Sequence, residues 1–329
     1  MELLDLTYKA FGLDISDSYI KIIKLNKKRG KLSVSSAIQT DIKPGIVESG
    51  IIKNEKALAE AIRLSCNKAK GEKIKTKYVA FSLPEEESFL QVIRMPKMNS
   101  EELKSAVLFE SENYIPIPID QMYLDFQVID TEKKLDFEDI LIVATPKKIV
   151  DSYVACIESA GLTPILAEIE SQSSARALVK DGFIKEAIAI INIGANNSDF
   201  SIFADGSVRF TLSLPISAMQ LSKVTNTPTA TFNQFISKVE KNIDYFQENA
   251  LDKFFSESNQ IKKIILSGDV PKQKNIAELI SKKLGIETEL GNPLINIPSL
   301  ENDKCAPSFL PFSTAIGLAL GSIKIEKEK

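Results

Sequence analysis

The sequence contains no histidine among its 329 residues. This absence excludes Ser–His–Asp and Cys–His catalysis, histidine-ligated zinc and a histidine pH switch. Cysteine is scarce: Cys66, Cys156 and Cys305 are odd in number and far apart, which is typical of reduced thiols in a cytosolic protein. Neither sign of charge dominates, since 41 Lys and Arg residues oppose 44 Asp and Glu residues. The net charge of -3 therefore favours neither nucleic acid nor anionic lipid as a partner.

Long apolar runs are missing as well. Residues 315–323 come nearest, but Gly317, Gly321 and Ser322 interrupt them, and a membrane-spanning helix needs ~18 apolar residues. This run predicts a buried helix near the carboxyl end. The first residues include Glu2 and Asp5 and lack the basic-then-apolar order of a signal peptide. We therefore expect a soluble, cytoplasmic protein.

Strand and helix patterns alternate from end to end, which predicts an α/β protein with several sheets. The predicted strands cover residues 11–15, 20–25, 32–38, 78–83, 89–94, 123–129, 140–144, 164–169, 188–194, 264–266 and 286–290. Helices are predicted after the cap Asn54, from a capping box at Asn99 to Pro116, and over residues 147–159, 171–179, 229–248 and 275–284. One helix is expected to fill the span between Pro215 and Ile264.

Two hairpin turns have the composition of phosphate-binding turns. Asp14 and Asn192 each lie two residues before a turn rich in Ser, Asn, Asp or Gly. The backbone N–H groups of such turns suit phosphate oxygens, and a carboxylate nearby can hold hydrated Mg²⁺. Gly268-Asp269 is a third candidate, where a strand runs into a turn before a helix. Ordinary hairpins with polar tips explain the same patterns, so both interpretations stay open.

A series of motifs along nearly the whole chain resembles one family. The most specific are Met95-Pro96-Lys97-Met98, Glu102-Leu103, Glu110, Tyr114-Ile115-Pro116 and Asp125-Phe126. They are joined by Gly12-Leu13-Asp14-Ile15-Ser16, Pro44-Gly45, Glu170-Ser171-Gln172, Leu266-Ser267-Gly268 and Ala315-Ile316-Gly317. The sequence resembles the PilM family, the cytoplasmic actin-like component of type IV pilus assembly, which is related to the division protein FtsA.

The resemblance implies an actin-like fold of two lobes. Lobe 1, subdomain 1A, would comprise residues 1–85 and 164–183, and the inserted subdomain 1C residues 86–163. Lobe 2, subdomain 2A, would comprise residues 184–322, with a last helix at 308–322 that could pack back on lobe 1. The family's further subdomain 2B is missing here, because only about 50 residues separate Pro215 from Ile264.

The resemblance also implies a site for ATP and Mg²⁺. Asp14 would lie near the metal and hold it through water, with Ser16, Asp17, Ser18 and Lys21 at the phosphates. The second phosphate turn would comprise Asn192, Gly194, Ala195, Asn196 and Asn197, with Gly268 and Asp269 near the nucleoside. Glu170 falls where actin-like ATPases position the attacking water, although a helix-capping carboxylate explains it equally well.

Three departures argue against hydrolysis. The family usually has Gly at the position of Ser16, Asp at that of Asn192 and Gly at that of Asp269. Because Asn192 carries no charge, it cannot help to hold Mg²⁺, which supplies much of the catalysis in phosphoryl transfer. With subdomain 2B missing, a degenerate ATPase is expected, which binds nucleotide weakly or not at all; whether it is an enzyme stays open.

The function that the resemblance implies is that of an adaptor. In PilM, a groove between 1A and 1C takes the extended cytoplasmic N-terminal tail of PilN, a bitopic inner-membrane protein. This chain would bind a PilN-like tail and reach the inner face of the membrane only through that partner, with no nucleic acid; self-association stays open. The alternatives are an FtsA-like division filament protein and a phosphotransferase of the same superfamily.

Overall fold

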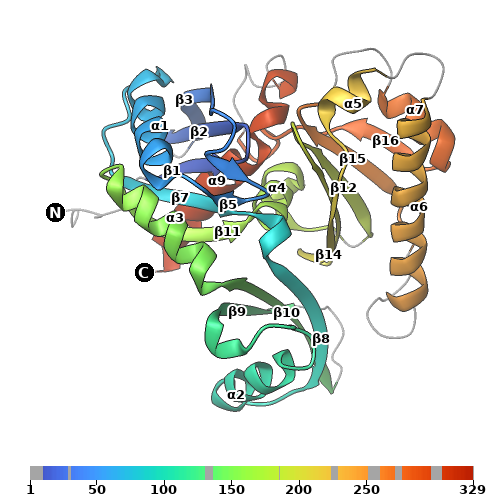
Figure 1. Ribbon diagram of the computed structural model, residues 1–329. Coiled ribbons are helices and arrows are strands. Elements are labelled where there is room, and N and C mark those ends of the chain that lie inside the picture. The colour runs from blue at the N-terminus through green and yellow to red at the C-terminus, as the bar shows by residue number, and fades with distance from the viewer. Residues whose placement is uncertain are drawn as a thin grey trace. The chain divides into compact units, whose positions relative to one another are not determined.

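The computed structural model describes residues 10–28, 31–129, 136–184, 186–223, 229–250, 260–270, 276–297 and 306–328 (Figure 1). Contacts divide the chain into two compact units. The first comprises Met1–Pro84, Asp151–Leu178 and Asn292–Lys329. The second comprises Glu85–Val150 and Val179–Gly291. This division joins most of the expected subdomain 1C to the expected lobe 2, and the subdomain boundaries from the sequence stay a prediction.

The first unit is built on a six-stranded sheet of order β11-β7-β1-β2-β3-β6. Its strands are β1 (Phe11–Ile15), β2 (Tyr19–Lys28), β3 (Lys31–Asp41), β6 (Lys70–Gly71), β7 (Tyr78–Leu83) and β11 (Thr163–Ile169). The strands β11, β7 and β1 are parallel neighbours, so their carboxyl ends share one edge of the sheet. A small hairpin, β4 (Val47–Glu48) and β5 (Ile51–Ile52), follows β3.

The helices of this unit are α1 (Glu55–Lys68), α4 (Glu170–Leu178), α9 (Ser313–Glu328) and the part of α3 (Lys147–Ser159) that follows Val150. The side chain of Asn54 accepts a hydrogen bond from the Ala57 N–H at 3.0 Å, so Asn54 caps α1 as predicted. Helix α9 packs closely on β1 and α4, because a Cβ on Gly12 would clash with the Ala315 carbonyl and one on Gly317 with the Ser173 carbonyl.

The second unit contains two sheets. The three-stranded sheet has the order β8-β10-β9, formed by β8 (Phe89–Pro96), β9 (Met122–Ile129) and β10 (Phe137–Pro146). Helix α2 (Ser100–Ser111) packs on it through Leu103 and Val107. The capping box predicted at Asn99 is present, since the Asn99 side chain accepts from the Glu102 N–H and the Glu102 carboxylate accepts from the Asn99 N–H.

The five-stranded sheet has the order β14-β13-β12-β15-β16. Its strands are β12 (Ile188–Ile193), β13 (Ser198–Ala204), β14 (Ser207–Leu214), β15 (Lys263–Gly268) and β16 (Glu287–Leu290). The helices are α5 (Ala218–Ser222), α6 (Ala230–Ala250) and α7 (Ile276–Leu284). The predicted apolar stripe of α6 is buried in the core of this sheet, and consists of Phe232, Phe235, Ile236, Val239, Ile243 and Phe246.

Some predicted boundaries are wrong. Helix α2 ends at Ser111 and not at Pro116, because the chain turns over residues 112–114 before Pro116 is reached. The span between Pro215 and Ile264, where one helix was expected, contains two helices, the short α5 and the long α6. Residues 308–312 belong to a 3-10 helix (Ala306–Phe312), and α9 begins at Ser313, after Pro311, whose nitrogen carries no hydrogen to donate.

Within the described part of the chain, no helix is both long and apolar enough to cross a membrane.

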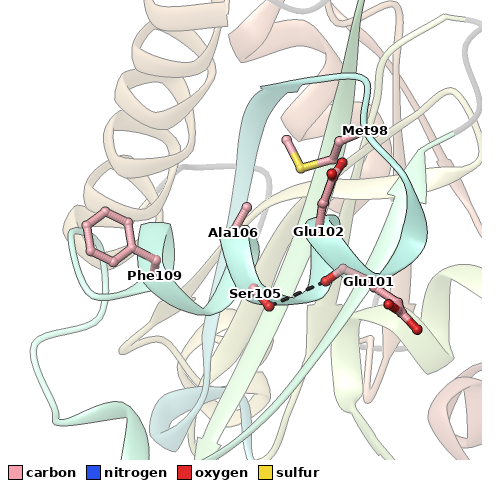
Figure 2. Close-up of a pocket in the computed structure, with 6 residues that line it drawn as sticks. All are labelled: Met98, Glu101, Glu102, Ser105, Ala106 and Phe109. Carbon is pink, nitrogen blue, oxygen red and sulfur yellow. Dashed lines mark hydrogen bonds between the residues drawn. The ribbon is translucent and has the colours of Figure 1, made fainter.

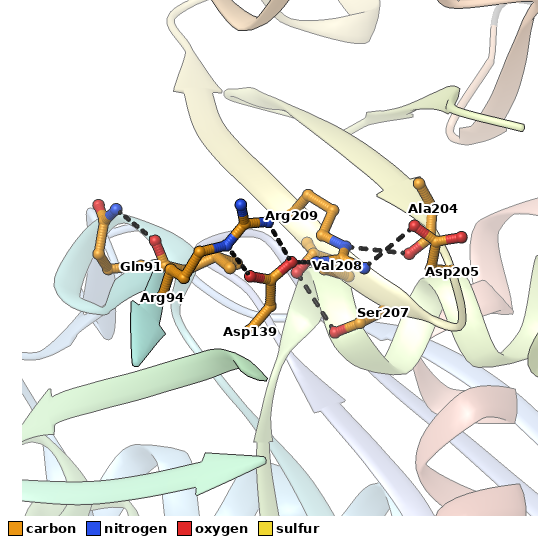
Figure 3. A network of polar contacts seen from close by, with 9 residues as sticks. Gln91, Arg94, Asp139, Ala204, Asp205, Ser207, Val208 and Arg209 are labelled. Carbon is orange, nitrogen blue, oxygen red and sulfur yellow. Dashed lines mark hydrogen bonds and ion pairs between the residues drawn. The ribbon is translucent and has the colours of Figure 1, made fainter. Parts of the chain in front are cut away.

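A buried ionic network joins the two sheets of the second unit (Figure 3). Arg209 of β14 is 6% exposed, and its guanidinium lies 3.6 Å from the Asp139 carboxylate of β10 and 3.2 Å from that of Asp205. Asp139 also pairs with Arg94 of β8 at 2.9 Å. Burial lowers the pKa of Arg209, and the carboxylates of Asp205 and Asp139 oppose that shift. Charges therefore hold the three-stranded sheet to β14.

We predict that Arg209→Met destabilises the protein by about 3–5 kcal/mol, because it removes a partner from a buried carboxylate. The double variant Arg209→Met with Asp139→Leu should recover part of this loss, since the most buried carboxylate is then removed as well, while Asp205 and Arg94, which each lose a partner, are more exposed. The control is Lys263→Met, which breaks the more exposed Lys263–Glu289 pair and should cost about 1 kcal/mol or less. Urea unfolding of each variant measures these changes. An Arg209→Met variant as stable as the wild type would refute the role of the network.

Two thiols lie in the first unit. Cys156 of α3 is buried, and its thiol donates to the Glu55 carbonyl across 3.6 Å, while Cys66 of α1 is half-buried. Burial raises the pKa of both thiols to about 11, and for Cys156 the Glu55 carboxylate adds to the effect. Cys305 lies outside the described residues. Because the thiolate is the reactive form, Cys66 and Cys156 should react slowly at neutral pH.

In a Cys305→Ser variant, both remaining thiols should react slowly with a disulfide reagent at pH 8. A pKa near 11 leaves roughly 200-fold less thiolate there than an ordinary cysteine has. The labelling rate should rise about tenfold for each pH unit up to the pKa. The urea-unfolded chain is the control, and native labelling at the same rate as the unfolded chain would contradict the prediction.

Candidate functional site

The first candidate turn joins β1 to β2. The Ser16 N–H donates to the Tyr19 carbonyl at 2.9 Å, and the Tyr19 N–H donates to the Ser16 hydroxyl at 3.2 Å. These bonds close a tight loop, and the Ser18 carbonyl accepts from the Ile42 N–H at 2.9 Å, next to the end of β3. The turn is therefore held by its own backbone and by the Ser16 side chain.

Asp14 lies at the end of β1 and is 7% exposed. Its carboxylate accepts from the Ser82 hydroxyl at 3.0 Å, and that hydroxyl accepts from the Ile15 N–H at 3.1 Å. Lys21, also 7% exposed, is the antiparallel partner of Asp14 in β2, so both side chains leave the same face of the sheet. The structure thus brings a fixed carboxylate and a buried ammonium together beside the turn.

Asp17 has a different environment from the one expected at a phosphate. Its two carboxylate oxygens accept from the Ser49 N–H at 2.8 Å and from the Gly50 N–H at 3.0 Å. Ser49 and Gly50 form the two-residue turn between β4 and β5, both with positive φ. The Gly50 carbonyl in turn accepts from the buried Tyr153 hydroxyl at 2.9 Å. In this structure Asp17 ties the first turn to the β4–β5 hairpin.

Glu170 begins α4 directly after β11. The register pairs Leu13 of β1 with Phe81 of β7, and Phe81 with Ala167 of β11. Glu170 and Asp14 therefore lie at the same carboxyl edge, two strands apart, or about 10 Å in the direction of the hydrogen bonds. Ligands of α/β sheets bind at such edges. The two roles considered for Glu170, positioning water and capping the helix, both agree with this place.

The second candidate turn, residues 194–197, joins β12 to β13. The Gly194 N–H donates to the Asn197 carbonyl at 2.9 Å, and the Gly194 carbonyl accepts from the Ala218 N–H at the start of α5. A Cβ at residue 194 would clash with the Asn197 carbonyl, so the turn requires glycine there. Ala195 and Asn196 form the tip. The Asn197 side-chain amide donates to the Glu86 carboxylate at 3.0 Å, which places a negative charge beside this turn.

Asn192, Gly268 and Asp269 come together next to it. Strands β12 and β15 are parallel, with Ile193 opposite Gly268, and the Asp269 N–H donates to the Ile193 carbonyl at 2.6 Å. A Cβ on Gly268, whose φ is 81°, would lie 2.5 Å from the Asn192 amide oxygen. The side chain of Asn192 therefore covers Gly268. Residues 271–275, where a helix N-terminus was expected, lie outside the described residues.

The charges of the two turns suit Mg-ATP unequally. The first turn offers the Asp14 carboxylate and the Lys21 ammonium, which fit a hydrated cation and an anion. At the second turn Asn192 offers only a neutral amide, the Asn197 amide is bonded to the Glu86 carboxylate, and Asp269 follows Gly268, so the acidic groups there disfavour phosphate. Within the described ranges, no three Cys, Asp or Glu side chains gather to hold a metal. The uncharged Asn192 and the acidic groups around the second turn do not fit a Mg²⁺–phosphate clamp.

Sequence reasoning missed two residues of these sites. Ser82 fixes Asp14, and Glu86 holds Asn197, but both lie more than 60 residues away from their partners in the sequence. Ser82 could have been noticed because it lies inside a strand predicted to be buried, where a hydroxyl needs a hydrogen-bond partner. The run Glu85-Glu86-Glu87 gives no such signal, because acidic turns are common on surfaces.

A family model described as "Type IV pilus assembly protein PilM" matches residues 12–227. The chain is similar to the solved structure "PilM-PilN type IV pilus biogenesis complex", with 19% identity, a TM-score of 0.79, and coverage of 96% of this chain and 98% of that chain. It is also similar to the ethanolamine utilization protein EutJ from Carboxydothermus hydrogenoformans, with 11% identity, a TM-score of 0.50, and coverage of 94% and 89% respectively. These likenesses show the actin-like ATPase fold. Since the family model matches more than half of the chain, the chain belongs to the PilM family of type IV pilus assembly proteins.

Proposed function

We propose that this chain is an adaptor of type IV pilus assembly that binds the cytoplasmic N-terminal tail of a PilN-like bitopic protein. The observation that carries the proposal is the family match, which spans residues 12–227 and so covers residues 86–163, where the inserted subdomain is expected. The similar solved structure is a PilM–PilN complex, and we extend its partner to this chain. Through that partner the chain would reach the inner face of the membrane.

The inserted subdomain has features that an extended tail can use. Strand β9 lies at one edge of its three-stranded sheet, paired with β10 on the other side. An edge strand offers backbone N–H and C=O groups to an added strand. Tyr123 and Val128 of β9 are 48% and 39% exposed, so apolar side chains accompany this edge. These features support docking on the inserted subdomain.

The adaptor role does not need nucleotide hydrolysis, and the second turn argues against it. The carboxylates of Glu86 and Asp269 and the uncharged Asn192 would weaken Mg-ATP binding there. We therefore propose that nucleotide binds weakly or not at all, with negligible turnover. In this proposal the two turns persist because they close the hairpins of the two sheets.

Tail binding is tested with a labelled peptide that carries the N-terminal tail of a PilN-like protein from the same genome. The full chain should bind it saturably, and hydrogen exchange should show slower exchange within residues 86–163, because an added strand takes up exposed amides. A scrambled peptide is the control. Absence of saturable binding would refute tail docking, and protection confined to residues 184–322 would refute the proposed place. Deletion of residues 86–162 is unsuitable, because it would remove α3, whose Tyr153 is buried in the first unit.

Mg-ATP binding is tested by calorimetry together with a phosphate-release assay. The wild type should show negligible turnover, and Asn192→Asp with Asp269→Gly should tighten Mg-ATP binding about tenfold or more, because it exchanges a repulsive charge for a metal-directed one. The control is Glu240→Gln, which removes an exposed charge on α6. Sustained Mg-dependent turnover by the wild type that Asp14→Asn abolishes would contradict the proposal.

A further inference from the structure

Helix α2 presents a mixed face beside the one that packs on the sheet, in which the exposed Phe109 continues from Met98 and Ala106 at the border of the core. Leu103, Val107 and Ser111 are buried. The other face carries Glu102, Ser105, Ala106 and Phe109, at the spacing i, i+3, i+4, i+7 that places residues on one side of a helix, and Met98 precedes it. Figure 2 shows Met98 beside Glu102 at one end of this face and Phe109 at the other end.

This face lines a shallow hollow of about 760 Å³, with Glu101 added to the residues above. The ring of Phe109 is 69% exposed, and the neighbouring Leu108 is 46% exposed. Removal of such apolar surface from water is favourable, and exposed apolar patches on proteins commonly mark interaction sites. The hollow lies wholly on the inserted subdomain, so its shape is set by α2 and the segment before it.

The shape of the hollow suits a helix. Figure 2 shows the short side chains of Ser105 and Ala106 between the longer side chains of Phe109 on one side and Met98 on the other. A ridge of side chains on another helix can lie over short residues and between long ones. Glu102 and Phe109 are seven residues apart, or about 10 Å along the axis, which corresponds to two turns of a docked helix.

The charge of the hollow specifies the kind of helix. Glu101 and Glu102 lie at the amino end of α2, and Glu110 follows Phe109. Lys104 is the one basic residue of this helix, so its charged side chains are mostly acidic. A cationic flank on the partner would complement these carboxylates. A second copy of α2 would instead oppose like charges, which disfavours self-association through this face.

We propose that this face of α2 binds a cationic amphipathic helix of a partner protein, with an apolar side chain seated between Met98 and Phe109. This goes beyond the docking of an extended tail, since the recognised element is a helix and the surface is α2 and not the β9 edge. This face would recognise the partner by its apolar side chains at helical spacing and by lysine or arginine on one flank.

The test uses a fluorescent peptide of about 15 residues, long enough to form a helix, with leucines at i, i+3, i+4 and i+7 and lysines beside them. A peptide in which glutamate replaces every lysine is the control for charge. Binding to the full-length chain is followed by fluorescence anisotropy at low and at high salt. Two variants probe the hollow, Phe109→Ser and Glu101→Lys. Two matched variants probe other surfaces of the same unit, Met219→Ser on α5, where the side chain is 70% exposed, and Glu240→Lys on α6.

The lysine peptide should bind the wild type, and the glutamate peptide should bind at least about tenfold more weakly. Phe109→Ser and Glu101→Lys should each weaken binding about tenfold, whereas Met219→Ser and Glu240→Lys should change it by about twofold or less. Equal losses with Glu101→Lys and Glu240→Lys would show attraction to net charge alone and overturn the proposal. Unchanged binding by Phe109→Ser, or no binding of the lysine peptide, would also overturn it. Circular dichroism of each variant checks that the chain remains folded.

Discussion

The pairing of Arg209 with Asp139 is the interaction on which the second unit depends. It joins β14 of the five-stranded sheet to β10 of the three-stranded sheet through two buried side chains. Arg94 is a second cationic partner of the Asp139 carboxylate. Thr211 adds a second link, because its hydroxyl donates to the buried Glu85 carboxylate at 2.7 Å. Buried charges are costly unless both partners stay in place. The inserted segment is therefore held to the five-stranded sheet as part of one compact unit.

The two candidate phosphate turns are both closed by backbone hydrogen bonds but differ in charge. At the first turn, Asp14 is fixed by Ser82 and lies opposite Lys21 in the sheet. At the second turn, the Gly194 N–H still closes the loop, but Asn197 is engaged by Glu86 and Asp269 lies beside Gly268. Geometry of this kind is set by the hairpins and survives changes of side chain, whereas affinity for an anion depends on charge. This contrast underlies the proposal of an adaptor without hydrolysis.

Local patterns predicted much of the fold. The alternation of strands, the Asn54 cap, the Asn99 capping box and the apolar stripe of α6 all follow from residues close in sequence, and the structure confirms them. Boundaries such as the end of α2 at Ser111 were missed, because competing turns decide them. The contacts Ser82–Asp14, Glu86–Asn197 and Arg209–Asp139 join residues far apart in the chain, so no local pattern could reveal them. Asp17 was expected at a phosphate, and its bonds to the β4–β5 turn were equally invisible in the sequence.

We propose that this PilM-family chain binds the tail of a PilN-like partner without control by nucleotide. The sharpest test is calorimetric titration of the full chain with the PilN-like tail peptide, in the absence and in the presence of a large excess of Mg-ATP. Coupling between two sites is reciprocal, so a nucleotide-driven switch must change the affinity for the tail. We expect dissociation constants that agree within about twofold under the two conditions. A change of about tenfold or more, in either direction, would contradict it.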